Sequence, residues 1–308
     1  MINYLKQEEI DREKWDQCID NAFNGMTYAK SWYLDLVTEQ WDALVENDYE
    51  SVFPLVYRKK YGIFYLYQPV FTQQLGIFST SLLTEDTVSD FIDSIPKHFR
   101  FAEINLNTFN KVQEGKYKVL NWLNHELDLI KPYDLIHKNY STNLKRNLKK
   151  AEKEKLTFVE NIKPDDIIKI FRENRGLNVS LNEEDYIKLN RLAYAGIYRG
   201  VIKTYGVYTT NNEICAGVIF MQSKKKKIFL FSGLTEQGKQ LNAMPFLIDQ
   251  FIQQNNQHHI TLDFEGSNDP NLARFYKSFG SKEITYPHLK INHFSFPFNI
   301  IFRVIKGI

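Results

Sequence analysis

Two carboxylates near the C-terminal end of the chain stand two residues apart in a segment whose pattern predicts a β-strand. Over residues 260–265, Leu262 and Phe264 would point to one side of the strand, and Asp263 and Glu265 to the other. A positioned carboxylate can take a proton from a nucleophile, so Glu265 is the preferred general base and Asp263 the second candidate. The alternative for Asp263 is a structural role, as hydrogen-bond acceptor for the turn that follows.

Basic side chains crowd a segment in the middle of the chain. The pattern of residues 140–155 predicts a helix with a narrow apolar stripe. Its other faces carry Lys145, Arg146, Lys149 and Lys150. Such a group can hold a phosphorylated ligand through charge-assisted hydrogen bonds. The alternative is an ordinary solvated helix face.

Several common kinds of site are absent from the sequence. It has no Walker loop, no GxSxG motif and no Rossmann fingerprint. The histidines, His258 and His259 among them, lack metal-ligand spacing, so no metal site is predicted. Cys18 and Cys215 are far apart and lack a CxxC partner, which excludes a disulfide framework and fits a reducing compartment.

The composition is typical of a folded globular protein. The chain has 308 residues, of which 43% are hydrophobic and 25% charged, so one large or two medium domains are expected. The net charge of +2 is too small for a general DNA binder, and contact with RNA would need a local basic patch. The N-terminus lacks a signal-peptide pattern, and no apolar run approaches the roughly 20 residues of a membrane span. We therefore expect a cytoplasmic protein without a membrane span.

The elements that must position these side chains form a mixed α/β pattern, of the α+β class. Each half is expected to hold a mixed, mostly antiparallel sheet flanked by helices, with the boundary at the basic helix between residues 1–139 and 140–308. The four lysines at 224–227 are expected at a solvated hairpin tip. In the second half, strands are predicted near 202–208, 214–222, 227–233 and 260–265, and helices near 164–174, 183–194, after the cap Asn242, and from Asp269-Pro270 to Gly280.

Four segments carry a resemblance to a known family, and together they span most of the chain. Residues 140–151 (YSTNLKRNLKKA) resemble the pattern S-x-N-x-R-R-x-I-x-K-A, and residues 262–267 (LDFEGS) follow in the expected order. Residues 272–280 (LARFYKSFG) are similar to an F-K-x-x-F-G ending and to the Y-x-x-x-G of ordinary acetyltransferases. With residues 69–76 (PVFTQQLG), they resemble the FemA/FemB-like branch of the GNAT-type acyl-CoA N-acyltransferase superfamily.

The resemblance implies two GNAT-type halves, with the donor site in the C-terminal one. In this superfamily the backbone of the central strand holds the pantetheine arm of the donor, at the point where the strand leaves its neighbour. That edge corresponds here to Ser232, Gly233 and Leu234. A glycine at this point would let a donor approach the backbone closely.

The resemblance also places the phosphates of the donor over the start of the next helix. The loop before that helix offers Gly238, Lys239 and Asn242, and the helix dipole favours anions there. The loop departs from the usual Q/R-x-x-G-x-G/A pattern, which leaves room for an aminoacyl-tRNA donor in place of coenzyme A. The alternative is a plain surface loop.

Amine acylation, which the resemblance implies, needs a base for the amine and an acid for the leaving group. Tyr276 aligns with the position that often supplies the acid in acetyltransferases, although the FemA/FemB pattern has Lys there. The alternative for Tyr276 is a tyrosine at the edge of the core. By the same resemblance, Lys145, Arg146 and Lys149 are candidates to bind a phosphorylated donor or acceptor.

The leading expectation is an N-acyltransferase that moves an acyl group from a coenzyme A thioester onto an amine of a small or cell-wall-related acceptor. The second is a FemA/FemB-type peptidyltransferase that uses aminoacyl-tRNA and acts on a peptidoglycan precursor. That group often carries a coiled-coil insertion, which this sequence lacks, and this favours the first reading. The third is a non-catalytic ligand-binding module of the same fold.

Overall fold

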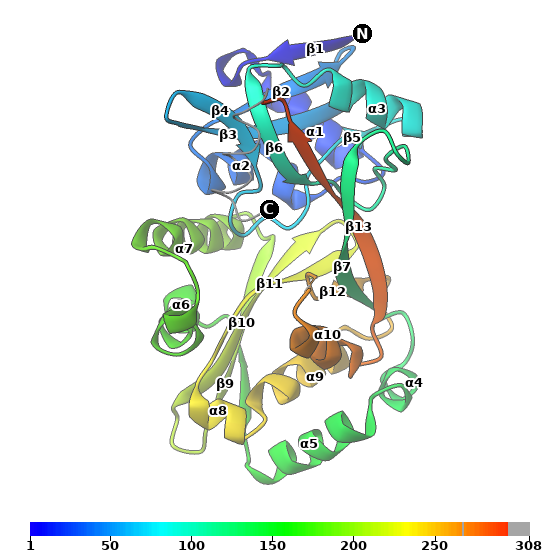
Figure 1. Cartoon of the computed structure of the whole chain (residues 1–308). Helices are drawn as coiled ribbons and strands as arrows, with labels where there is room; N and C mark the ends of the chain where they lie inside the picture. The colour runs from blue at the N-terminus through cyan, green and yellow to red at the C-terminus, as the bar shows by residue number, and fades with distance from the viewer. Residues whose placement is uncertain (267, 295–308) are drawn as a thin grey trace. The chain divides into compact units, whose positions relative to one another are not determined.

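The computed structural model describes residues 1–266 and 268–294, which divide into two compact units (Figure 1). Of the described residues, the first unit holds 1–122 and 285–294, and the second holds 123–266 and 268–284. The predicted boundary before residue 140 lies later than this division. The reason is the core of the second unit, which already includes Leu127 and Ile136. Ser267, the last residue of the LDFEGS segment, lies outside the described residues.

The sheet of the first unit is mixed and mostly antiparallel. Its strands run in the order β1-β2-β3-β4-β6-β13, and β5 pairs with β3. β4 and β6 are parallel neighbours, whereas the other neighbours are antiparallel. The bounds are β1 Ile2–Leu5, β2 Trp41–Glu46, β3 Ser51–Lys60, β4 Ile63–Tyr67, β5 Phe78–Ser79, β6 Phe99–Asn105 and β13 Lys282–Asn292.

Two helices of the first unit, α1 and α3, begin at polar side-chain caps and bury one apolar face. Asp11 caps α1 by accepting hydrogen bonds from two backbone N–H groups, and Thr84 caps α3. Trp15 of α1 packs against Trp41 at a ring distance of 4.9 Å. The bounds are α1 Arg12–Asn21, α2 Ser31–Val37 and α3 Glu85–Asp93, with 3-10 turns at Gln7–Glu9 and Thr27–Ala29.

The sheet of the second unit has the order β7-β12-β11-β10-β9-β8. β11 and β12 run parallel, and the other neighbours are antiparallel. The strands predicted near 202–208, 214–222 and 227–233 are therefore confirmed. The bounds are β7 Lys118–Asp128, β8 Thr157–Glu160, β9 Ile202–Tyr208, β10 Ile214–Ser223, β11 Lys226–Leu234 and β12 Thr261–Asp263.

Helices cover this second sheet: α6 packs on β10 and β11, and α9 packs on β9 and β10. The predicted basic helix is α5, and Ser141 caps it by accepting a hydrogen bond from Leu144 N–H. In the part of the chain that the structure describes, no helix is both long and apolar enough to cross a membrane. The bounds are α4 Tyr133–Lys138, α5 Thr142–Lys153, α6 Pro164–Glu173, α7 Glu183–Tyr198, α8 Glu236–Gln240, α9 Ala243–Asn255 and α10 Pro270–Lys277, with a 3-10 turn at Arg175–Asn178.

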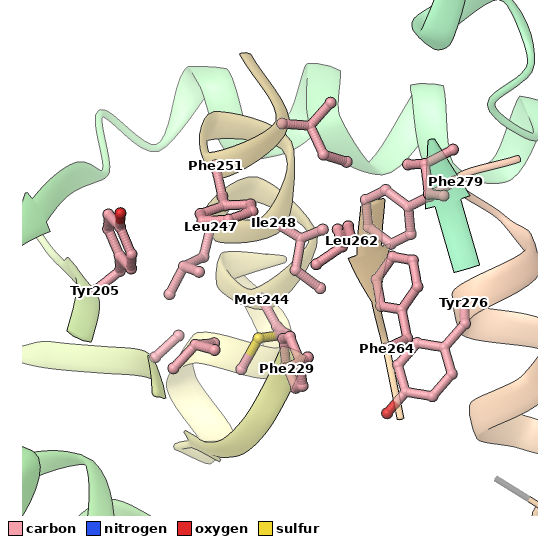
Figure 2. Close-up of a cluster of buried hydrophobic side chains, with 14 of the residues drawn as sticks. Tyr205, Phe229, Met244, Leu247, Ile248, Phe251, Leu262, Phe264, Tyr276 and Phe279 are labelled. Carbon is pink, nitrogen blue, oxygen red and sulfur yellow. The ribbon is translucent and has the colours of Figure 1, made fainter. Parts of the chain in front are cut away.

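Aromatic side chains from several elements fill the core of the second unit (Figure 2). Phe220 of β10 stacks on Phe251 of α9, with ring centres 4.0 Å apart. Phe264 stacks on Tyr276 of α10 at 4.8 Å and lies 5.8 Å from Phe279. Phe264, the residue that follows β12, thus packs this strand against α10.

A buried carboxylate joins two helices of this unit. Asp249 of α9 accepts hydrogen bonds from the hydroxyl of Tyr133 at 3.0 Å and from Gln253 Nε2 at 2.8 Å. Burial raises the pKa of Asp249, because the charged form is poorly solvated there. The two donors offset that cost, and the Tyr133 hydroxyl fixes α4 against α9.

We predict that Tyr133→Phe lowers the free energy of unfolding by about 1–2 kcal/mol, because it leaves a buried carboxylate with one donor fewer. Urea denaturation followed by circular dichroism would measure the change. Tyr198→Phe is the control, since Tyr198 is 90% exposed and should show no effect. Equal losses in the two variants would refute a stabilising role for the Tyr133 hydroxyl.

Candidate functional site

The central strand β11 parts from β12 after three residue pairs. The pairing runs from Lys226 opposite Thr261 to Ile228 opposite Asp263. β11 continues to Leu234 while bonded to β10, and a register shift near Phe229 marks a bulge in that ladder. Among the described strands, none pairs with the other edge of residues 229–234. The predicted strand edge at 232–234 therefore lies at an interrupted ladder.

A pocket of about 580 Å³ adjoins this edge within the second unit. It brings together most of the side chains predicted for the donor site. From the predicted set, its lining contains Ser232, Leu234, Gly238, Lys239, Asn242 and Tyr276. Residues that the sequence analysis did not select complete the lining: Asn147, Phe171, Asn174, Arg175, Asn178, Phe229, Thr235, Glu236, Met244, Pro245, Leu272 and Phe275.

Gly233, also predicted for the donor edge, is not among the described residues that line the pocket. Its side-chain position faces α6 instead. A Cβ atom there would lie 2.5 Å from the carbonyl oxygen of Ile167 and 2.5 Å from Ile170. Close packing of α6 on β11 therefore explains this glycine, without any donor.

The loop predicted to bind phosphates folds into the short helix α8 and uses its own amides. Gly238 N–H donates to Thr235 Oγ1 at 3.0 Å, and Lys239 N–H donates to the Thr235 carbonyl at 3.0 Å. Leu241 and Asn242 N–H donate to carbonyls of the same turn. A phosphate loop needs amides that point at the ligand. In this conformation these four amides are already satisfied within the loop.

Two residues of this loop have local structural roles. A Cβ atom on Gly238 would lie 2.1 Å from the Cys215 carbonyl oxygen, so this residue must be glycine for α8 to pack on β10. Asn242 adopts a left-handed conformation with φ 56°, and its side chain makes no cap hydrogen bond. The predicted start of α9 at Asn242 is confirmed, since this residue occupies the N-cap position, but its side chain does not cap the helix and the residue forms the sharp bend between α8 and α9.

Tyr276 combines a core ring with a hydroxyl at the pocket. The side chain is 8% exposed, and Figure 2 shows its hydroxyl pointing away from Phe279. Burial, and then the nearby Glu265 carboxylate, raise the pKa of Tyr276 to about 12. The hydroxyl thus keeps its proton at neutral pH and can donate it to an oxygen or sulfur in the pocket. Both roles weighed for this residue are compatible with its position.

Glu265 was predicted inside a strand, but it lies beyond the end of that strand in the structure. β12 ends at Asp263, and Glu265 adopts a left-handed conformation with φ 50°. Its N–H donates to Asp263 Oδ1 at 3.0 Å. The predicted alternation that places both carboxylates on one strand face is therefore wrong, because a turn intervenes. Glu265 is not among the described residues lining the pocket, although its charge affects Tyr276.

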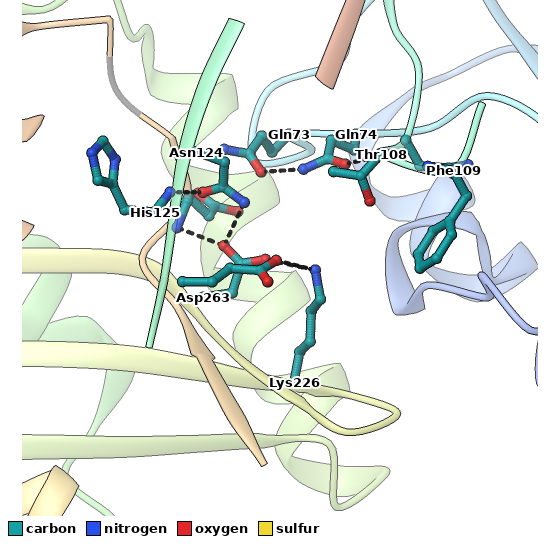
Figure 3. A network of polar contacts seen from close by, with 11 residues as sticks. Gln73, Gln74, Thr108, Phe109, Asn124, His125, Lys226 and Asp263 are labelled. Atoms are coloured by element: carbon teal, nitrogen blue, oxygen red, sulfur yellow. Dashed lines mark hydrogen bonds and ion pairs between the residues drawn. The ribbon is translucent and has the colours of Figure 1, made fainter. Parts of the chain in front are cut away.

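Asp263 is enclosed by donors (Figure 3). Its carboxylate accepts a hydrogen bond from Asn124 Nδ2 at 3.0 Å and from Glu265 N–H at 3.0 Å, and it lies 3.3 Å from Lys226 Nζ. The side chain is 2% exposed. These contacts match the structural alternative, a hydrogen-bond acceptor for the following turn.

The prediction that the lysines at 224–227 form a solvated hairpin tip is wrong for Lys226. Lys224 and Lys225 are exposed in the turn, but Lys226 begins β11 and forms ion pairs with Glu126 and Asp263. Burial lowers the pKa of Lys226, but the Asp263 and Glu126 carboxylates outweigh it, and the net pKa is raised. Burial raises the pKa of Glu126. The sequence offered one signal for this cluster, a predicted strand that began beside the lysine run.

His125 of β7 is a second residue that the sequence analysis missed. Its ring is fully buried, and neither ring nitrogen has a hydrogen-bond partner among the described residues. The ring lies 6.0 Å from that of Tyr276. Burial, and then the charge of Lys277, lower the pKa of His125, so the neutral form is favoured.

The described residues contain no group of three His, Cys, Asp or Glu side chains that could hold a metal ion.

The predicted phosphate-binding cations of α5 are not among the described residues that line the pocket. Lys145 Nζ donates to the carbonyl of Lys138, the last residue of α4, at 2.9 Å. Arg146 bonds within its own helix, and Lys149 is exposed. The residue of α5 that lines the pocket is Asn147. The cations themselves are arranged as a solvated face, and their predicted role in binding stays a prediction.

We predict that Lys226→Met lowers the free energy of unfolding by about 2–3 kcal/mol, because it leaves two carboxylates poorly compensated. The lysine is 25% exposed, which places the cost at the low end for a broken buried pair. Thermal or urea denaturation would measure it. Lys225→Met, an exposed neighbour, is the control and should change stability by no more than about 0.5 kcal/mol. Similar values for the two lysines would contradict a stabilising ion pair.

We also predict that the stability of the second unit falls as pH drops below about 6.5, the ordinary pKa of histidine. His125 has a lowered pKa in the folded state, so the unfolded chain binds a proton that the folded chain refuses. The slope is at most about 1.4 kcal/mol per pH unit for one proton. His125→Phe should remove this contribution, as urea denaturation between pH 5 and 8 would show. His259→Gln, an exposed control, should keep the wild-type slope, and an unchanged slope in His125→Phe would reject the mechanism.

Comparisons with known proteins place the fold. No protein-family model and no curated protein matches the sequence. Among solved structures, FemX has a TM-score of 0.64 and 12% identity over 99% of this chain and 100% of its own. L-PGS from Bacillus licheniformis has a TM-score of 0.56 and 10% identity over 96% of both chains, and a conserved protein of unknown function from Bacteroides thetaiotaomicron has 0.60 and 9% over 94% and 99%. The chain therefore shares the fold of FemX.

Proposed function

We propose that this chain is an aminoacyl or acyl transferase, with the donor carbonyl bound at the open edge of β11 in the pocket of the second unit. One observation carries the proposal: the interrupted strand edge and the Tyr276 hydroxyl border one pocket. The fold shared with FemX and the resemblance of the sequence to the FemA/FemB-like branch support transfer to an amine. The acceptor would be a small amine or a peptidoglycan precursor.

The chemistry follows from the groups at that edge. The amine nitrogen attacks the donor carbonyl carbon, and backbone N–H groups of β11 beyond the last pair with β12 stabilise the oxygen as negative charge develops. The carbon–oxygen bond of an ester donor, or the carbon–sulfur bond of a thioester, then breaks. Tyr276 gives its proton to the leaving atom, and Glu265 is the candidate to take the proton that the amine loses. Positioning of the two reactants supplies much of the remaining rate.

The state of α8 favours an aminoacyl ester over a coenzyme A thioester as donor. The pyrophosphate of coenzyme A needs several free amides, and the amides of Gly238 and Lys239 are bonded to Thr235. The cation of this loop, Lys239, has Glu236 3.8 Å away, which reduces its attraction for an anion. An aminoacyl-tRNA brings no pyrophosphate to this position. We therefore propose aminoacyl-tRNA as the donor, in place of the coenzyme A thioester expected first.

The test is turnover by the full chain with two donors, labelled aminoacyl-tRNA and labelled acetyl-coenzyme A, with a nucleotide-linked muropeptide as acceptor. We expect labelled product from aminoacyl-tRNA. Turnover with acetyl-coenzyme A alone would reverse the choice of donor. Binding of either donor without any product would instead support a non-catalytic module.

In the same assay, Tyr276→Phe should lower kcat about 100-fold with little change in KM, because a general acid acts in the transition state. The ring of Tyr276 supports the core, so phenylalanine keeps the packing and removes only the hydroxyl. Tyr198→Phe is the matched control and should leave kcat unchanged. Wild-type kcat in Tyr276→Phe would exclude it as the acid.

A further inference from the structure

A second pocket, of about 550 Å³, adjoins the donor pocket within the second unit. Both pockets are lined by Asn147, Pro245 and Phe275. These three residues belong to α5, α9 and α10 and form a common wall, so the two hollows are neighbours. The function proposed above uses only the first of them.

The lining of this second pocket is polar and carries positive charge. It contains the amides of Asn143, Asn147 and Asn271, the hydroxyls of Ser141 and Ser278, and the cations Arg274 and Lys277, beside Leu144, Pro245 and Phe275. No carboxylate is among the described residues that line it. Amides, hydroxyls and cations without a carboxylate suit a ribose phosphate, which offers hydroxyls and anionic oxygens together.

Arg274 is the cation with the greatest capacity for a ligand. It is exposed on α10, and it forms no ion pair with any residue in the described ranges. Lys277, by contrast, already pairs with Glu283 at 2.6 Å. A guanidinium can bind a phosphate through two parallel hydrogen bonds, which an amide cannot do. Arg274 therefore supplies the charge, and the asparagine side chains supply orientation.

The start of α5 adds to the same field. Ser141, the cap of this 12-residue helix, lines the pocket, and the first turn of the helix contains no acidic residue. The positive end of the helix dipole is thus not compensated there. The N–H groups of Leu144 and Lys145 are bonded to Ser141, as those of Gly238 and Lys239 are to Thr235, so the two helix starts differ in charge and not in free amides. The first turn of α8 contains the acidic Glu236, whereas that of α5 contains no acidic residue, so a phosphate is better served by the second pocket.

We infer that this second pocket binds the ribose phosphate at the nucleotide end of the donor. The inference rests on the proposed function, because it assumes that the acyl end occupies the adjoining pocket. The same chemistry is found in the 3′ end of an RNA and in the nucleotide of coenzyme A. The lining identifies the ligand group as a ribose phosphate, and titration with one probe for each source distinguishes RNA from coenzyme A.

The experiment is isothermal titration of the full chain with two probes, the dinucleotide cytidylyl-adenosine and adenosine 3′,5′-bisphosphate. We expect the first to bind, and we expect Arg274→Gln to weaken its Kd about tenfold, since hydrogen bonds to a charged group are lost. Arg199→Gln, an exposed arginine at the end of α7, is the control and should bind as the wild type does. Arg274→Lys should recover part of the affinity.

Each outcome decides the inference. Binding of adenosine 3′,5′-bisphosphate alone, with the same dependence on Arg274, would keep the subsite and assign it to a coenzyme A donor. Absence of binding by both probes, or an unchanged Kd in Arg274→Gln, would overturn it. Probe binding that depends on Arg274 in a chain without turnover would refute the proposed function only. Turnover with a donor KM unaffected by Arg274→Gln would refute the subsite only.

Discussion

The separation of β11 from β12 is the constraint on which the rest of the second unit depends. The two strands pair through three residues and then diverge, with a bulge in β11 near Phe229 and a turn after Asp263. Parallel strands that diverge leave a row of backbone groups without a ladder partner, which is costly unless something covers or uses them. Tyr276 and the aromatic core close one side of the gap, and the pocket occupies the other.

Buried charge fixes the closed end of that gap. Asp263 and Glu126 lie on neighbouring strands, and Lys226 of β11 joins them. The lysine contacts the carboxylates of both β7 and β12, so it ties three strands together at the point where the ladder ends. A buried ion pair adds little net stability over an apolar pair, but it specifies geometry, because only one register satisfies all its partners. The divergence of the strands is thus defined by polar contacts, while the packing around it is defined by apolar ones.

Sequence patterns predicted the fold of this chain better than its site. The strands β9 to β11 and the helices α5 to α7 follow from periodicity and caps, which are local properties. The roles of Lys226 and His125 could not be predicted in this way, because each depends on strands that are distant in sequence. Glu265 was predicted in the wrong place because residues 262–265 alternate between apolar and acidic. A short strand followed by a turn can show the same alternation as a longer strand. Gly233 and Gly238 were recognised as special positions, but the close approach that each permits is to α6 and to β10.

Helix α8 has a consequence for how the site selects its ligand. The Gly238 N–H, which an incoming anion would need, already donates to Thr235 Oγ1. Thr235 therefore competes with the anion for this N–H. A pyrophosphate could bind there only by unwinding a helical turn that Gly238 anchors to the backbone of β10. Under the proposed function, the choice between donors would then depend on the equilibrium between the folded and unwound forms of the five-residue helix α8, and not on any contact with the acyl group.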